Sequence, residues 1–136
     1  NIDTRIEVTM TSFVERRILE RFHVPNAIVK YKIDSLFSDQ IPIEGEGELI
    51  DLTVKGVRFE SEEEFSAGAR LSIEIIVSDE EPIPLIGNIV WTRQLEQSGK
   101  INSVIQFIEF DDDPEFNSYD SLEKLEALEK EYSKFK

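Results

Sequence analysis

The sequence has no cysteine, a single histidine and no apolar run near the roughly 18 residues that a membrane-spanning helix requires. Disulfides, thiolate catalysis and cysteine-based zinc sites are therefore excluded, and we expect no insertion into a membrane. The one histidine, His23, has no evident partner and is a poor candidate for a general base or a metal ligand. A phosphate-binding glycine loop and a nucleophile elbow are also missing. These absences predict a protein that is not an enzyme and that has no catalytic residues, metal or cofactor.

Basic residues are scarce. The sequence has 15 lysines and arginines but 29 aspartates and glutamates, which gives a net charge of −14. An acidic surface repels polyphosphates, so we expect no binding to a nucleic-acid polymer or to an anionic membrane surface. Arg16, Arg17 and Arg21 nevertheless lie together near the start of the chain. A local cationic patch on an acidic body suits a small anion. The chain opens without a signal-peptide pattern, and we expect a cytoplasmic protein.

Between residues 27 and 110 the hydrophobic pattern has a period of two, which is typical of half-buried β-strands. Clusters of turn residues separate the apolar stretches. We predict six strands, at residues 27–33, 47–52, 56–60, 71–77, 85–91 and 101–110. Within the fifth strand, Trp91 falls on the same face as Leu85 and Ile89, which predicts that Trp91 belongs to the core. Strands without helices between them pair antiparallel, and closure into a barrel removes their unpaired edges.

Helical patterns flank the strands on both sides. Ser12 and Glu15 form a capping box that predicts a short helix, continuing to about Phe22 and ended by Pro25. A second helical pattern opens at Asp120. Its narrow apolar stripe comprises Leu122, Leu125, Leu128 and Tyr132. This second helix can cover an open end of the barrel or pair with another chain.

These patterns divide the chain into three parts. Residues 1–14 form an N-terminal segment that can be the tail of an upstream region, residues 15–112 form the barrel domain, and residues 113–136 hold the C-terminal helix. The fold class that follows is an all-β barrel of about six antiparallel strands with a C-terminal α-helix.

Arg17 and Arg21 stand four residues apart, with Arg16 adjacent. In a helix their guanidinium groups project from one face, and in an extended segment they can enclose a ligand from two sides. The planar fork of donors matches phosphate oxygens and also the O6/N7 edge of guanine. The alternative is a solvated helix face on which the arginines pair with Glu15 and Glu20.

The stretch 51–56 (DLTVKG) lies between two predicted strands. The Asp51 carboxylate can accept hydrogen bonds from guanine N1–H and N2–H₂, and Thr53 can bond a phosphate or a neighbouring backbone group. Gly56 permits a positive φ and a close approach of the backbone. The alternative is an ordinary strand–turn–strand, in which Lys55 only faces solvent.

In order and spacing these motifs resemble the PilZ domain. The stretch 17–21 (RILER) fits the pattern R-x-x-x-R, and 51–56 is similar to D/N-x-S-x-x-G. Further along, 87–91 (GNIVW) resembles the G-x-V-V-W strand of that family, and 105–108 (IQFI) resembles its closing strand. The resemblance covers roughly residues 15–110. The chain departs from the family pattern where Thr53 replaces serine and where Val104 stands in place of a small residue.

The resemblance implies a six-stranded barrel that binds cyclic di-GMP, a bacterial second messenger. Arg17 and Arg21 would clamp its phosphates or guanines, while Asp51, Thr53 and Gly56 would meet it at the barrel rim. Additional candidates for ligand contact are Arg16 and Arg93. Binding would order the arginine segment and pass the signal to a partner protein or an upstream domain. The alternative function is a ligand-independent adaptor that acts through protein–protein contacts.

Overall fold

The computed structural model describes residues 21–33 and 43–133. Their strands are β1 (Ile28–Ile33), β2 (Ile43–Leu52), β3 (Gly56–Ser61), β4 (Arg70–Ile76), β5 (Ile83–Gln94) and β6 (Ile101–Phe107), followed by the helix α2 (Tyr119–Tyr132). The segment 1–14 and the residues Arg16 and Arg17 lie outside the described residues, as does most of the predicted N-terminal helix. The predicted end of that helix is wrong, because Phe22 forms an extended bridge with Leu52.

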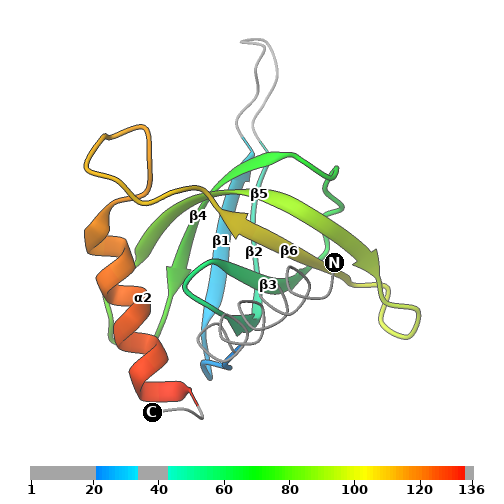
Figure 1. Ribbon diagram of the computed structural model, residues 1–136. Coiled ribbons are helices and arrows are strands. Elements are labelled where there is room, and N and C mark those ends of the chain that lie inside the picture. The colour runs from blue at the N-terminus through cyan, green and yellow to red at the C-terminus, as the bar shows by residue number, and fades with distance from the viewer. Residues whose placement is uncertain (1–20, 34–42, 134–136) are drawn as a thin grey trace, which may run out of the picture.

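The strands close into a barrel in the order β1–β2–β3–β6–β5–β4, and every neighbouring pair is antiparallel. Figure 1 shows the barrel with α2 along one side. Closure requires β1 to pair with β4 and β3 with β6, although these strands are far apart in the sequence. The predicted six-stranded antiparallel barrel with a C-terminal helix is thereby confirmed.

The barrel interior holds one continuous hydrophobic core. Alternate residues of the strands point inward, as the period of two predicts, and their side chains are buried. Tyr31, Phe59 and Phe65 form an aromatic cluster with ring centroids 5.0–5.9 Å apart. Burial of this apolar surface is the main stabilising contribution to such a fold.

Two β-bulges interrupt the alternation. In β2 the register with β3 shifts between Leu49 and Asp51, and in β5 the register with β6 shifts between Ile89 and Trp91. Each bulge inserts one extra residue, so the side chains beyond it change faces. Trp91 consequently points outward and is 38% exposed. The prediction that Trp91 belongs to the core is wrong for this reason.

The helix α2 begins after the N-cap Ser118, whose side chain accepts a hydrogen bond from the Ser121 backbone N–H at 3.1 Å. Leu125 and Leu128 from the predicted stripe are buried in the barrel's core cluster. The stripe is therefore used for packing within the chain. No helix in the described ranges is long and apolar enough to cross a bilayer.

The segment between β6 and α2 is attached to β5 by a backbone hydrogen bond from the Ile108 N–H to the Ile86 carbonyl oxygen at 2.9 Å and by the side chain of Asn117. Asn117 is buried, and its Oδ1 accepts a hydrogen bond from the Ile86 backbone N–H at 2.6 Å. Its Nδ2 donates to the backbone oxygens of Ile86 at 2.9 Å and of Ile108 at 3.0 Å. The amide thus satisfies main-chain groups of β5 where that strand extends beyond β6.

Candidate functional site

A cleft of about 220 Å³ lies on the outer side of β3 and β6, beside the β2–β3 turn. It is lined by Arg21, Asp51, Thr53, Lys55, Gly56, Val57, Arg58, Val90, Val104, Ile105 and Gln106. The structure therefore brings together the four main site residues predicted from the sequence that it describes. Three cationic side chains face one carboxylate here, so the cleft has a local excess of positive charge on a chain with a net charge of −14.

Arg21 is brought to the cleft by the two residues that follow it. Phe22 and Leu52 exchange backbone hydrogen bonds of 3.0 and 2.8 Å, and the Phe22 side chain is buried in the core. The exposed His23 places its Nδ1 2.8 Å from the Ile50 carbonyl oxygen, within reach of a hydrogen bond donated by the ring. This segment before β1 is therefore attached to the end of β2 beside its bulge, with Arg21 as the last described residue toward the N-terminus.

Asp51 is paired with an arginine that belongs to none of the sequence motifs. Arg58 lies directly opposite Asp51 in the β2–β3 ladder, and its Nη2 donates to Asp51 Oδ2 at 2.7 Å. The Asp51 side chain is 16% exposed and that of Arg58 is 30% exposed. A partly desolvated, charge-assisted hydrogen bond of this kind holds the carboxylate in one orientation.

The Thr53 hydroxyl organises the turn between β2 and β3. Its Oγ1 accepts hydrogen bonds from the backbone N–H groups of Lys55 at 3.0 Å and of Gly56 at 3.1 Å. The Thr53 backbone N–H in turn donates to the Gly56 carbonyl oxygen at 2.9 Å. The hydroxyl thus closes the turn, a role that serine and threonine share. Lys55 is exposed, as expected for a turn residue, and its side chain borders the cleft.

Gly56 is required by a close approach of the neighbouring strand. A Cβ atom at this position would lie 2.5 Å from the Ile105 carbonyl oxygen of β6. The predicted positive φ is wrong, because the glycines with a positive φ in the described part of the chain are Gly68 and Gly99. A close backbone approach does require the glycine, but it is the approach of β6. The expected approach of the Gly56 backbone to a ligand stays a prediction.

Other lining residues were missed because they come from strands that are distant in the sequence. Gln106 and Val104 belong to β6, and Val90 is the extra residue of the β5 bulge. For Arg58 a signal was present, because the period of two places it on the outer face of β3, but its partner depends on the register of the turn. Arg93 lies elsewhere and borders a depression formed by residues 93–98.

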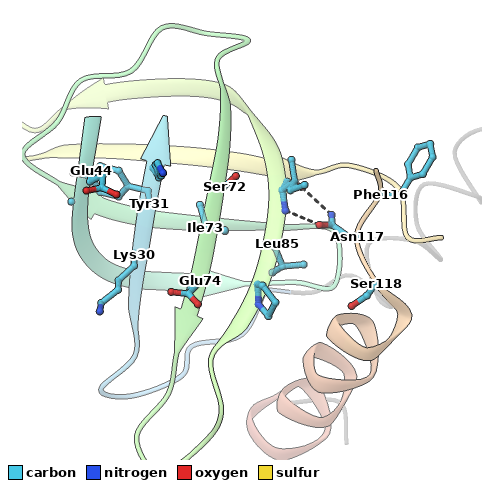
Figure 2. Close-up of a pocket in the computed structure, with 14 residues that line it drawn as sticks. Lys30, Tyr31, Glu44, Ser72, Ile73, Glu74, Leu85, Phe116, Asn117 and Ser118 are labelled. Atoms are coloured by element: carbon cyan, nitrogen blue, oxygen red, sulfur yellow. Dashed lines mark hydrogen bonds between the residues drawn. The ribbon is translucent and has the colours of Figure 1, made fainter. Parts of the chain in front are cut away.

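A larger groove of about 670 Å³ lies on the outer surface of β1, β4 and β5. Figure 2 shows it between these strands and the start of α2, with the hydrogen bonds of Asn117 at its border. Its cations, Lys30 and Lys32, stand opposite Glu46 and Glu44 in the β1–β2 ladder. The lining of this groove holds two lysines and two glutamates, Glu44 and Glu74, and so has no excess of positive charge. The lining of the smaller cleft holds three cationic side chains and one carboxylate, so the smaller cleft is the better candidate for an anionic ligand.

The chemistry that the smaller cleft offers is that of binding. Guanidinium groups and one carboxylate supply donors and an acceptor for a planar, anionic ligand. Within the described ranges, no group of three or more potential ligands could hold a metal ion.

Three comparisons with known proteins concern the family and the fold of this chain. The family model of the PilZ domain matches residues 15–123. No curated protein gave a match. Among solved structures, the inhibitor of motility (MotI/DgrA) from Bacillus subtilis is similar, with a TM-score of 0.53 and 12% sequence identity. The match covers 79% of this chain and 47% of that one, so this chain spans about half the length of that protein. At this level of identity the likeness concerns the fold alone.

Proposed function

This chain belongs to the PilZ domain family, a family of cyclic di-GMP-binding and adaptor domains, and from this membership we propose that it is a receptor for cyclic di-GMP. The observation that carries the proposal is the convergence of Arg21, Asp51 and Gly56 on one cleft, although Arg21 is 30 residues distant from Asp51 in the sequence. Such convergence of polar side chains on one cleft is expected of a binding site.

The ligand we propose has a chemistry that fits the lining of the cleft. Its phosphates are attracted by the local positive charge, and its guanines present both donors and acceptors. In this proposal the Arg21 guanidinium binds phosphate or the O6/N7 edge of guanine, and the Asp51 carboxylate accepts from N1–H and N2–H₂. Thr53 gives the rim its shape by accepting a hydrogen bond from the Gly56 backbone N–H, and Gly56 allows β6 to lie close beside the turn.

The cleft of about 220 Å³ is smaller than the roughly 300–1,000 Å³ of ordinary small-molecule sites. A dinucleotide would therefore extend beyond it, and in the proposed complex Arg17, with Arg16 as a further candidate, contributes the remaining contacts. Because Phe22 is anchored in the core, rearrangement on binding would be confined to the chain before Arg21. We propose that this change passes to a partner protein or an attached domain, and that the protein works in the cytoplasm.

The proposal is tested by isothermal titration with cyclic di-GMP, with GTP as the control ligand. We expect a Kd of about 10 µM or tighter for the wild type, and a loss of at least about tenfold in affinity for Arg17→Ala and for Arg21→Ala. Arg93→Ala is the matched control, because Arg93 borders a different depression and should leave the affinity unchanged. Absence of binding heat at a protein concentration of about 100 µM would overturn the proposal.

The alternative function is that of a ligand-independent adaptor, and the structure disfavours one way in which such an adaptor would bind a partner. A partner that docked on the stripe of α2 would need Leu125 and Leu128, and both are buried in the core cluster.

A further inference from the structure

We propose that Arg58 is a specificity-determining residue of the cyclic di-GMP site, where it acts with Asp51 to distinguish guanine from adenine. The inference rests on the proposed function, because it concerns which base the same cleft accepts. Arg58 itself belongs to none of the sequence motifs, and its position in the barrel is known only from the structure.

Arg58 occupies the second position in a row of four outward-facing residues, one each from β2, β3, β6 and β5. Asp51 in β2 pairs with Arg58 in β3, and Arg58 pairs on its other side with Val104 in β6. Val104 in turn pairs with Trp91 in β5. The two β-bulges lie at the ends of this row, immediately before Asp51 and immediately before Trp91. Asp51, Arg58 and Val104 all line the cleft. The row therefore presents a carboxylate, a guanidinium and an apolar side chain next to one another at the ligand.

The ion pair leaves binding capacity on both partners. The structure gives a single contact between them, from Arg58 Nη2 to Asp51 Oδ2 at 2.7 Å. A carboxylate has about four lone-pair positions and a guanidinium has five N–H donors, so one shared hydrogen bond exhausts neither group. With the two side chains 16% and 30% exposed, both remain reachable from the cleft. The pair thus offers a fixed acceptor beside a fixed donor.

In the part of the chain that the structure describes, one N–H donor of the Arg58 side chain is left without a partner. Its Nε is buried and has no hydrogen-bond partner among the described residues. Buried donors in native structures are nearly always paired, and an unpaired one opposes folding. The unpaired Nε therefore offsets part of what the ion pair with Asp51 contributes to the stability of the hairpin.

An acceptor beside a donor matches guanine and opposes adenine. The guanine edge carries two donors, N1–H and N2–H₂, next to the O6 acceptor. The Asp51 carboxylate can therefore accept from N1–H and N2–H₂ while the Arg58 guanidinium donates to O6. In adenine the order is reversed, since N1 is an acceptor and the adjacent N6 amine is a donor. Adenine would place its acceptor against the carboxylate and its donor against the guanidinium. A site with fixed polar groups strongly rejects a ligand that leaves them unpaired.

The experiment compares the affinities of cyclic di-GMP and cyclic di-AMP for the wild type, Arg58→Met and Arg58→Lys. Methionine keeps much of the apolar stem without the donors, and lysine keeps the charge without the fork. We expect Arg58→Met to lose about 10- to 100-fold in affinity for the guanine dinucleotide and at most about threefold for the adenine dinucleotide. Arg58→Lys should show an intermediate preference. Arg93→Met is the matched control and should keep the wild-type ratio of affinities.

If the ion pair is merely structural, Arg58→Met lowers the thermal midpoint of unfolding but leaves the ratio of the two affinities unchanged. That result overturns the inference. If Arg58→Met does not fold, the ratio measured for Arg58→Lys decides by the same criterion. Failure of the proposed function looks different, because the wild type itself would then not bind cyclic di-GMP, and the present inference would fall with it.

Discussion

At the scale of the residue, the candidate site depends on one position where any side chain would collide with a neighbouring strand. Gly56 stands opposite Gln106 at the start of β3, and the Lys55 carbonyl oxygen beside it accepts a hydrogen bond from the Phe107 backbone N–H at 2.8 Å. A Cβ at Gly56 would meet the Ile105 carbonyl oxygen, which is main chain and cannot rotate away. Gly99 has a different reason for being glycine, since its φ is +74° and a Cβ there would meet no atom within 4 Å.

We therefore expect Gly56→Ala to lower the free energy of unfolding by about 2–3 kcal/mol, because β3 and β6 must separate. Gly99→Ala, the control, should lose about 1 kcal/mol through its left-handed backbone alone. Urea unfolding followed by circular dichroism measures both. The Gly56 variant should also lose cyclic di-GMP binding, whereas the Gly99 variant should keep it. Equal destabilisation by the two substitutions would contradict the role given to the close approach.

At the scale of the element, α2 contains an unfavourable charge. Glu129 lies near the C-terminus of the helix, where the helix dipole disfavours an anion. Its Oε2 is buried without a hydrogen-bond partner among the described residues. Burial, and after it the nearby Glu126, raise the pKa of the Glu129 carboxyl above its ordinary value. The charged form of Glu129 is therefore less stable in the folded chain than in the unfolded one.

The sign of the pH dependence follows from this raised pKa. The folded chain binds the Glu129 proton more tightly than the unfolded chain does. The resulting contribution to the free energy of unfolding is therefore complete below the pKa that Glu129 has in the unfolded chain. It is lost as pH rises through the pKa that Glu129 has in the folded chain. At pH 7 Glu129→Gln should therefore raise the free energy of unfolding, and the gain should vanish near pH 4, about where the carboxyl is protonated in the folded and the unfolded chain alike. Denaturant unfolding at both pH values checks this. Glu123→Gln, a position in the first half of the same helix, should show a smaller change, and an equal gain there would point to net charge instead.

At the scale of the whole molecule, charge is distributed unevenly. The chain has a net charge of −14, yet the cleft gathers Arg21, Lys55 and Arg58 around a single carboxylate. An anionic ligand is repelled by the body of such a protein and attracted at one place, which favours a defined site over diffuse association. Because the cleft is bounded by β2, β3, β5 and β6 together, its integrity depends on the closed barrel.

A ligand that binds only the closed barrel stabilises it by mass action. With free cyclic di-GMP at about 100 times its Kd, the free energy of unfolding should rise by about 2.7 kcal/mol. The measurement is a set of urea unfolding curves at increasing ligand concentration, which should give the same Kd as the titration. Arg21→Ala should need correspondingly more ligand for the same gain. A stabilisation that is identical in the wild type and in Arg21→Ala would show that the ligand acts elsewhere on the protein.

The local pattern of the sequence by itself determined the barrel class and pointed to several residues of the candidate site. Side-chain alternation reports directly on which residues can face a core, so the strands, their antiparallel pairing and the C-terminal helix were predictable. The motif spacing likewise identified Arg21, Asp51, Thr53 and Gly56, which lie in one cleft. The contacts predicted for Arg16 and Arg17 stay predictions, because these residues lie outside the described part of the chain.

Tertiary structure alone decided how the strands are registered and therefore which side chains meet. The bulge before Trp91 moved that side chain from the expected core position to the surface, and no local pattern marks where an extra residue is inserted. The pairing of Asp51 with Arg58 depends on the same kind of information, because one residue of slip would send Arg58 to the opposite face. Alternation along a strand is a local property, whereas register arises from the packing of all six strands at once.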